Sequence, residues 1–198
     1  MTKEHLIKQF EKMKINKRVI SVFKEVLREK FVLPEWKEMA YEDTPLPIMA
    51  GQTISQPTTV VLMLDALEIK EDNKVLEIGT GSGYNAALLS KLAKEVYSIE
   101  RIKELAEMAR NNLKKTKNVK VIHADGKKGY EKEAPYDRII VTAAAEKIPD
   151  ILLEQLKDNG ILLMPVGPEY GQELIRVRKK GKEYYHEKLG GYVFVPLL

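Results

Sequence analysis

Hydrophobic residues in the first 40 positions recur at the three- and four-residue spacing of a single helical face. Residues 3–40 are therefore expected to form short amphipathic helices whose apolar sides pack on a core. Asn16 is suited to be an N-cap between two of these helices. Pro34 is expected to break the helical pattern.

Residues 41–56 follow no period and are rich in proline, glycine and threonine, which predicts an irregular segment. A new helical pattern begins at Pro57, a residue type favoured in the first turn of a helix. Ser55 stands just before this helix and is suited to cap it.

From residue 57 onward, short hydrophobic runs alternate with helical patterns. Helices are expected after Ser55 and at 84–93, 103–114 and 149–156, and strands at 75–78, 96–99, 119–122, 138–141 and 161–164. This alternation predicts a doubly wound, mostly parallel α/β sheet of Rossmann-like type with helices on both faces. The last part of the chain has three β-type runs joined by glycine turns, at 173–178, 183–187 and 192–195. They predict an antiparallel C-terminal edge.

The chain of 198 residues is long enough for one sizeable core, and no repeat or linker divides it. We expect a single domain over 1–198, with residues 1–56 as a helical segment that covers the binding site and residues 57–198 as the sheet core. The absence of cysteine excludes disulfides, thiolate metal sites and a cysteine nucleophile. The three histidines show no metal-ligand spacing, so no metal is expected.

Lysines give the chain a net charge of +4, but acidic residues are interleaved with them almost everywhere. This pattern favours an ordinary solvated surface over a nucleic-acid-binding face. Neither an apolar leader nor a run of about 20 apolar residues is present. We therefore expect a cytoplasmic protein without nucleic-acid or membrane partners, as a monomer or a small homo-oligomer.

Three glycines, Gly79, Gly81 and Gly83, follow a predicted strand and open a predicted helix. Such glycines let the backbone turn tightly and approach a ligand at the helix N-terminus. Counted from Gly81, the spacing also satisfies the dinucleotide fingerprint, with Glu100 19 residues later (100 − 81). Glu77 argues against a dinucleotide because its carboxylate would repel a pyrophosphate. The same carboxylate suits the ammonium and sulfonium groups of S-adenosylmethionine.

Acidic residues also end the next two predicted strands. Glu100 can accept hydrogen bonds from both ribose hydroxyls, and Arg101 beside it is counted among the cofactor-binding candidates. Asp125 and Gly126 are placed for the adenine edge, although an Asp-Gly pair is often only a turn. Over residues 73–165, this pattern resembles the class I S-adenosylmethionine-dependent methyltransferases.

From about residue 40 to the end, the chain resembles the protein-L-isoaspartate O-methyltransferase family. The resembling segments are Tyr41–Asp43, Leu46–Ile48, Gly51–Pro57, Leu76–Ala87, Ala134–Asp137, Val141–Ala145, Pro165–Gly167 and Val193–Leu197. The run from Thr53 to Ser55 is distinctive of the family. The chain departs from the pattern at Thr58 and Thr59, where the family often has a histidine or an aromatic residue.

The resemblance implies methyl transfer from S-adenosylmethionine to the free α-carboxylate of L-isoaspartyl residues, so damaged proteins and peptides would be the partners. Ser55 would orient this carboxylate, with Thr53 beside it, as the catalytic residues. Gln52, Thr53, Ile54 and Ser55 would also close over the cofactor. The segments 143–145 and 165–167 would line the substrate cleft. A carboxylate is already ionised at neutral pH, so orientation and desolvation would suffice without a general base.

An RNA or small-molecule acceptor is the alternative. Residues 141–145 lack the Pro-Pro-aromatic motif of enzymes that methylate exocyclic amines of bases. Methylation at C5 of cytosine needs a thiolate, which this chain cannot supply. A non-catalytic binding module and a dinucleotide oxidoreductase are less favoured still.

Overall fold

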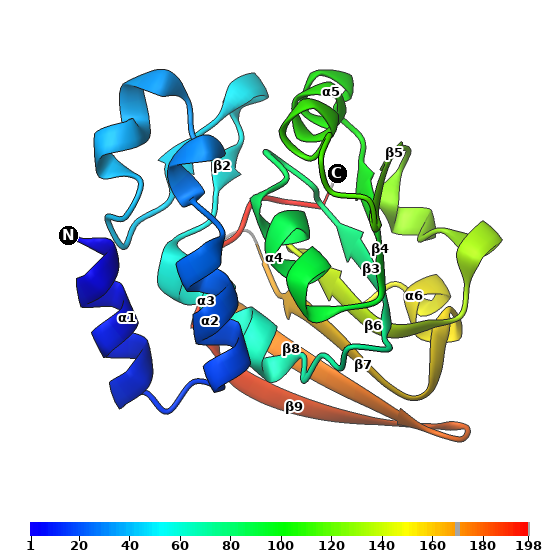
Figure 1. The fold of residues 1–198 in the computed structure, drawn as a ribbon. Coiled ribbons are helices and arrows are strands. Elements are labelled where there is room, and N and C mark those ends of the chain that lie inside the picture. Colours follow the sequence, from blue (N-terminus) through cyan, green and yellow to red (C-terminus); the bar gives the residue numbers. More distant parts are fainter. Residues whose placement is uncertain (169–170, 198) are drawn as a thin grey trace.

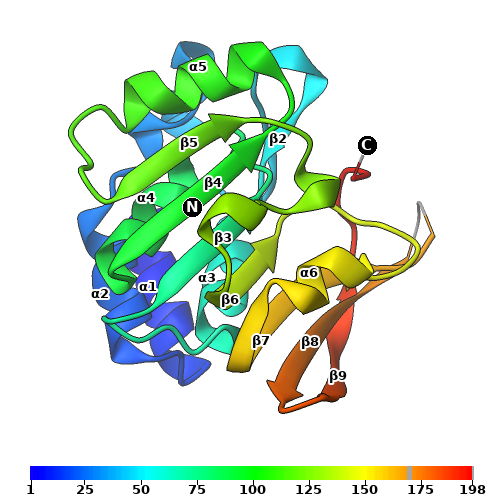
Figure 2. The same ribbon diagram turned by 90° about the vertical axis from the view of Figure 1, so that its right-hand side faces the viewer.

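The computed structural model describes residues 1–168 and 171–197. Its centre is a seven-stranded sheet with the order β5-β4-β3-β6-β7-β8-β9, seen in Figures 1 and 2. The strands are β3 (Lys74–Ile78), β4 (Glu95–Glu100), β5 (Val119–His123), β6 (Tyr136–Val141), β7 (Leu156–Val166), β8 (Gln172–Lys180) and β9 (Glu183–Tyr192). Strands β3 to β7 run parallel, whereas β8 and β9 are antiparallel. The predicted mostly parallel sheet with an antiparallel edge is confirmed.

Helices cover both faces of this sheet because successive residues of each strand point to opposite sides. Along β3, Val75 faces one hydrophobic cluster, while Leu76 and Ile78 face the other. The first cluster lies under α1 (Lys3–Lys12), α2 (Lys17–Glu25), α3 (Pro57–Ala66), α4 (Tyr84–Leu92) and α5 (Lys103–Asn112), and the second under α6 (Asp150–Glu154). No helix within the described residues combines the length and the hydropathy needed to cross a bilayer.

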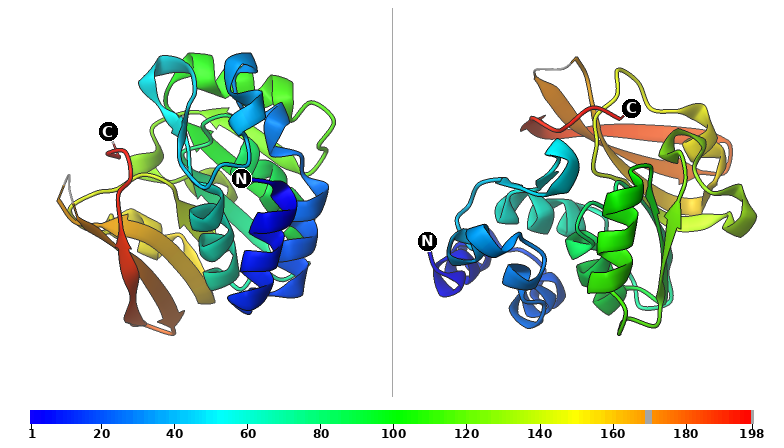
Figure 3. Two further views of the ribbon diagram at one scale, coloured as in Figure 1. Left: turned by 90° about the vertical axis from the view of Figure 1, so that its left-hand side faces the viewer. Right: turned by 90° about the horizontal axis from the view of Figure 1, so that it is seen from above.

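The N-terminal segment packs on α3 and α4 (Figure 3). Asn16 caps α2 as predicted, because its side chain accepts a hydrogen bond from the backbone N–H of Arg18. After α2 come two short 3₁₀ turns, η1 (Arg28–Lys30) and η2 (Pro34–Met39). The predicted break at Pro34 is therefore the start of a turn.

Arg28 joins this N-terminal segment to the rest of the molecule. Its side chain is fully buried, and its Nε atom donates a hydrogen bond to the carbonyl oxygen of Ala40 at 2.7 Å. The guanidinium lies over the Tyr84 ring of α4, 5.2 Å from the centroid. Burial lowers the pKa of Arg28 to about 10, so the side chain keeps its charge at neutral pH.

Several sequence-based expectations were wrong. Gln56, not Ser55, occupies the N-cap position of α3, although the Gln56 side chain makes no capping hydrogen bond. The helix expected up to residue 156 ends at Glu154, and Leu156 already belongs to β7. The separate strand expected at 192–195 does not form, because β9 continues through its glycines to Tyr192. The chain then pairs with Ala144 through backbone hydrogen bonds on either side of Pro196.

Candidate active site

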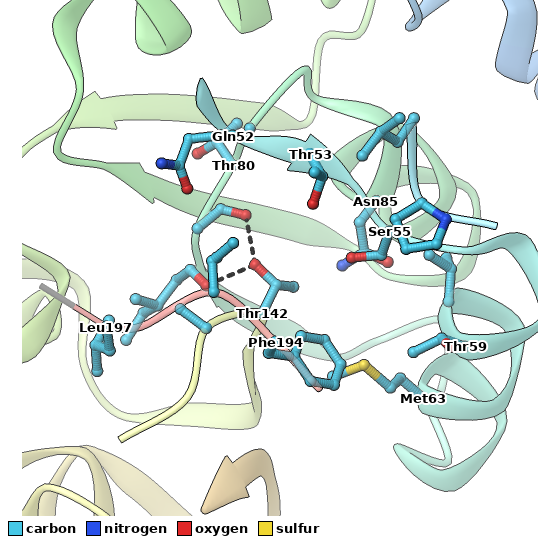
Figure 4. A pocket seen from close by; sticks show the side chains of 18 of the residues that line it. Gln52, Thr53, Ser55, Thr59, Met63, Thr80, Asn85, Thr142, Phe194 and Leu197 are labelled. Atoms are coloured by element: carbon cyan, nitrogen blue, oxygen red, sulfur yellow. Dashed lines mark hydrogen bonds between the residues drawn. The ribbon is translucent and has the colours of Figure 1, made fainter. Parts of the chain in front are cut away.

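A cavity of about 1270 Å³ lies at the carboxyl ends of β3, β4 and β6. The chain passes from β3 to β4 and β5 on one side and returns to β6 on the other side of β3. Open α/β sheets bind their ligands at such a reversal of strand order, outside the carboxyl ends of the strands. Figure 4 shows side chains from the N-terminal segment, the glycine loop and the C-terminal tail pointing into this cavity.

The glycine loop between β3 and α4 has the left-handed backbone that its sequence predicts. Gly79, Gly81 and Gly83 have φ values of 95°, 53° and 87°. The hydroxyl of Thr142, at the end of β6, lies 2.8 Å from the carbonyl oxygen of Gly79 and 3.1 Å from that of Ile78 (Figure 4). Thr142 therefore holds the loop in place, a role that the sequence analysis did not assign to it.

Replacing Gly79 with alanine should both destabilise the protein and distort this loop. The new Cβ would overlap Oγ1 of Thr142, and the residue would have to keep a φ of 95°. Backbone strain and overpacking together should lower the free energy of unfolding by about 2–4 kcal/mol, measured by urea denaturation. The double variant Gly79→Ala/Thr142→Ala removes the overlap, so it should lose less stability than the sum of the losses of the two single variants. Strictly additive losses would show that Thr142 is not the obstacle.

Glu100 connects the glycine loop to the start of α5. Its side chain is 6% exposed and borders the cavity. One carboxylate oxygen accepts a hydrogen bond from the N–H of Gly81 and the other from the N–H of Ile102, both at 2.9 Å. Each oxygen keeps a lone pair for a ligand. Arg101 lines the same side of the cavity.

Of the predicted Asp125-Gly126 pair, only Gly126 borders the cavity. Asp125 accepts a hydrogen bond at 3.0 Å from the N–H of Lys127 within its own turn. A Cβ at Gly126 would overlap Ile78 of β3, so a glycine lets this turn pack against the strand. The contact of Asp125 with adenine stays a prediction.

Glu77 lies beneath the glycine loop and not among the residues that line the cavity. Its fully buried carboxylate accepts hydrogen bonds from the hydroxyl of Ser98 and from Nδ2 of Asn85. Burial raises the pKa of Glu77 to about 7, although these two hydrogen bonds act in the opposite direction. Asn85, which the sequence analysis passed over, is the partner of Glu77 that borders the cavity.

The segment predicted to close over the cofactor forms one wall of the cavity. A short antiparallel pair, β1 (Leu46–Pro47) and β2 (Thr53–Ile54), carries it, with the 3₁₀ turn η3 (Met49–Gly51) between the strands. Gln52, Thr53, Ile54 and Ser55 all border the cavity, as expected. Figure 4 shows the Thr53 hydroxyl and the Ser55 side chain directed inward.

Ser55 keeps its hydroxyl free because another residue caps the helix that follows. Asp43 accepts a hydrogen bond from the N–H of Thr58 at 2.9 Å and another from the Thr58 hydroxyl at 2.7 Å. Thr58 is the second residue of α3, so Asp43 satisfies one of the helix's free N–H groups from 15 positions upstream. Within the described residues, no group hydrogen-bonds to the Ser55 hydroxyl.

Asp43→Ala should lower the free energy of unfolding by about 1–2 kcal/mol, the usual effect of losing a helix cap. Asp43→Asn should lose much less, because its side-chain oxygen can still accept from the N–H of Thr58. Urea denaturation of both variants measures the difference. A stability of Asp43→Ala within about 0.3 kcal/mol of the starting protein would rule out this capping role.

The C-terminal tail forms the opposite wall, which the sequence analysis did not foresee. Backbone hydrogen bonds join the tail to Ala144, from the N–H of Ala144 to the oxygen of Val195 and from the N–H of Leu197 to the oxygen of Ala144. Phe194 and Leu197 face the cavity opposite Thr53 (Figure 4). The sequence signal for this wall was the apolar run Val193–Leu197, which follows a polar strand at the end of the chain.

The segments predicted to line the substrate cleft contribute little to the cavity. Of the three alanines at 143–145, only Ala143 borders it. Ala145 instead pairs with β7, donating to Pro165 and accepting from the N–H of Gly167. The run 165–167 is therefore paired with backbone and lies outside the cavity lining.

The chain matches a known protein family along its whole length. The family model described as Protein-L-isoaspartate(D-aspartate) O-methyltransferase matches residues 1–198. The chain is 52% identical over 188 residues to the protein-L-isoaspartate O-methyltransferase of Ignicoccus hospitalis, covering 92% of this chain and 89% of that protein. It is 50% identical over 184 residues to that of Dictyoglomus thermophilum, covering 92% and 84%.

A solved structure shares the fold as well. It is a putative protein-L-isoaspartate O-methyltransferase from Plasmodium falciparum, in complex with S-adenosyl-L-homocysteine. The two structures superpose with a TM-score of 0.85 at 28% identity, over 100% of this chain and 99% of that one. This chain is therefore a member of the protein-L-isoaspartate(D-aspartate) O-methyltransferase family.

Proposed function

We propose that the cavity brings S-adenosylmethionine and an isoaspartyl carboxylate together and that Ser55 orients the carboxylate. As a family member, the chain is an S-adenosylmethionine-dependent enzyme that methylates the free carboxylate of L-isoaspartyl residues in damaged proteins. The family assignment decides against the RNA or small-molecule acceptor considered from the sequence. The observation that carries the proposal for Ser55 is its free hydroxyl at the cavity wall.

The residues around the cavity fit the cofactor. The left-handed glycine loop leads into the N-terminus of α4, where backbone can approach a ligand closely. Glu100 keeps lone pairs that can accept the ribose hydroxyls. S-adenosylmethionine supplies a methyl group that its sulfonium has already activated. Gln52, Thr53 and Ile54 would cover it from the side of the N-terminal segment.

The chain itself has to orient the acceptor and exclude water. A carboxylate with a pKa of about 4 needs no general base. The Ser55 hydroxyl can donate its proton to one carboxylate oxygen and leave the other free to take the methyl group. Because the hydroxyl is neutral, it binds the carboxylate without lowering its nucleophilicity as strongly as a cation would. Met63, Phe194 and Leu197 form an apolar wall that limits water (Figure 4).

A ligand-protection experiment tests the cofactor part of this proposal. S-adenosylhomocysteine at about 100 times its Kd should stabilise the protein by about 2.7 kcal/mol, and NAD at the same concentration should not. Thermal unfolding with each ligand provides the measurement. Protection by NAD alone would point to a dinucleotide site instead. A cytoplasmic location and the oligomeric state stay predictions from the sequence.

A further inference from the structure

Asn85 connects the buried Glu77 carboxylate to the cavity, because it hydrogen-bonds Glu77 and also lines the cavity. It is the second residue of α4 and borders the cavity. Its Nδ2 atom donates a hydrogen bond to Oε1 of Glu77 at 2.8 Å. Figure 4 shows the Asn85 carboxamide directed into the cavity.

Glu77 determines which way the carboxamide of Asn85 is turned. The other oxygen of Glu77 accepts the hydroxyl of Ser98, which in turn lies 2.6 Å from the hydroxyl of Thr80. In the structure, Glu77 accepts its hydrogen bond from the N–H side of the Asn85 carboxamide, which turns the oxygen side of the carboxamide away from Glu77. The Oδ1 atom of Asn85 is left as an acceptor, and no group in the described part of the chain donates to it.

The charge around Asn85 favours a cationic ligand. Glu77 and Glu100 both lie at this end of the cavity, and neither forms an ion pair with a lysine or arginine among residues 1–168 and 171–197. A buried carboxylate without a countercharge is costly, and a nearby cation reduces that cost. A free acceptor atom backed by a carboxylate is complementary to an ammonium group.

We propose that Asn85 binds the α-ammonium group of S-adenosylmethionine through Oδ1 and that Glu77 is the positioning residue behind it. Glu77 thus acts on the cofactor through Asn85, whereas the sequence suggested a direct contact. The inference rests on the proposed function, since it assigns one part of the cofactor to one residue of the same cavity.

Calorimetric titration with two ligands tests the assignment. S-adenosylhomocysteine carries the ammonium group, whereas 5′-methylthioadenosine lacks the whole amino-acid portion. Asn85→Leu should raise the Kd of S-adenosylhomocysteine about 10- to 100-fold, the range for a lost hydrogen bond to a charged group. The Kd of 5′-methylthioadenosine should stay within about twofold. Glu77→Gln should show the same selectivity with a smaller loss, whereas damage to the loop would weaken both ligands.

Three results would overturn the assignment. If Asn85→Leu raised the Kd of both ligands equally, Asn85 would only stabilise the loop and would not bind the ammonium group. An unchanged Kd for S-adenosylhomocysteine with a raised KM for an isoaspartyl peptide would place Asn85 on the acceptor side. If the unmodified protein fails to bind S-adenosylhomocysteine, the proposed function itself fails. Should Asn85→Leu not fold, Asn85→Ala carries the same comparison.

Discussion

Replacing Ser55 with alanine is expected to lower kcat about 100- to 1000-fold, the usual effect of removing one positioned hydrogen-bond donor from an active site. The hydroxyl is free because Asp43 caps α3 in its place. Without it, the acceptor carboxylate would sample orientations in which neither oxygen lines up with the methyl group. Binding of S-adenosylhomocysteine should change by no more than about threefold, a difference of less than 1 kcal/mol.

Steady-state kinetics with an isoaspartyl peptide measures kcat, and calorimetry with S-adenosylhomocysteine measures its Kd. Ser90→Ala is a matched control, because Ser90 lies outside the cavity lining and bonds the carbonyl oxygen of Ala87 in its own helix. Its kcat should stay near that of the unmodified enzyme. If Ser55→Ala turns over as fast as this control, the orienting role of Ser55 is wrong.

Replacing Glu100 with alanine should weaken S-adenosylhomocysteine binding about 10- to 100-fold, through the loss of charge-assisted hydrogen bonds worth about 1.5–3 kcal/mol. The same change leaves the N–H groups of Gly81 and Ile102 without their acceptor. The free energy of unfolding should therefore also fall, by about 1–3 kcal/mol. Both effects have one origin, because the carboxylate that borders the cavity also ties the glycine loop to α5.

Calorimetry and urea denaturation separate the two effects of this substitution. Glu100→Gln keeps one oxygen acceptor and should lie between alanine and the unmodified protein in both measurements. Glu104→Ala, an exposed carboxylate in the first turn of α5, is the control for loss of charge alone. If Glu100→Ala bound S-adenosylhomocysteine with unchanged affinity, Glu100 would not be a cofactor-binding residue.

The fold was predictable from the sequence because the relevant signals are local. Each parallel strand contains a short, mostly hydrophobic run, and helical patterns follow β3, β4 and β6. The three loop glycines stand where a left-handed backbone is required. The antiparallel edge was also predictable, although its last strand was not. Gly190 and Gly191 continue β9 and do not turn the chain.

Contacts between distant residues account for what the sequence did not reveal. The cap of α3 comes from Asp43 in an irregular segment, where no local pattern marks it. Thr142 reaches the glycine loop only because β6 lies beside β3 in the sheet. The sequence predicted Glu77 as a cofactor-binding residue. Its burial, and its link to the cavity through Asn85, depend on which face of β3 it occupies.

The most direct test of the account compares two synthetic peptides that differ only in one residue, isoaspartate or normal aspartate. Each is incubated with methyl-labelled S-adenosylmethionine, and methanol released on base treatment reports the ester. We expect label on the isoaspartyl peptide alone, and loss of that label with Ser55→Ala. Equal labelling of both peptides, or labelling of neither by an enzyme that still binds S-adenosylhomocysteine, would contradict it.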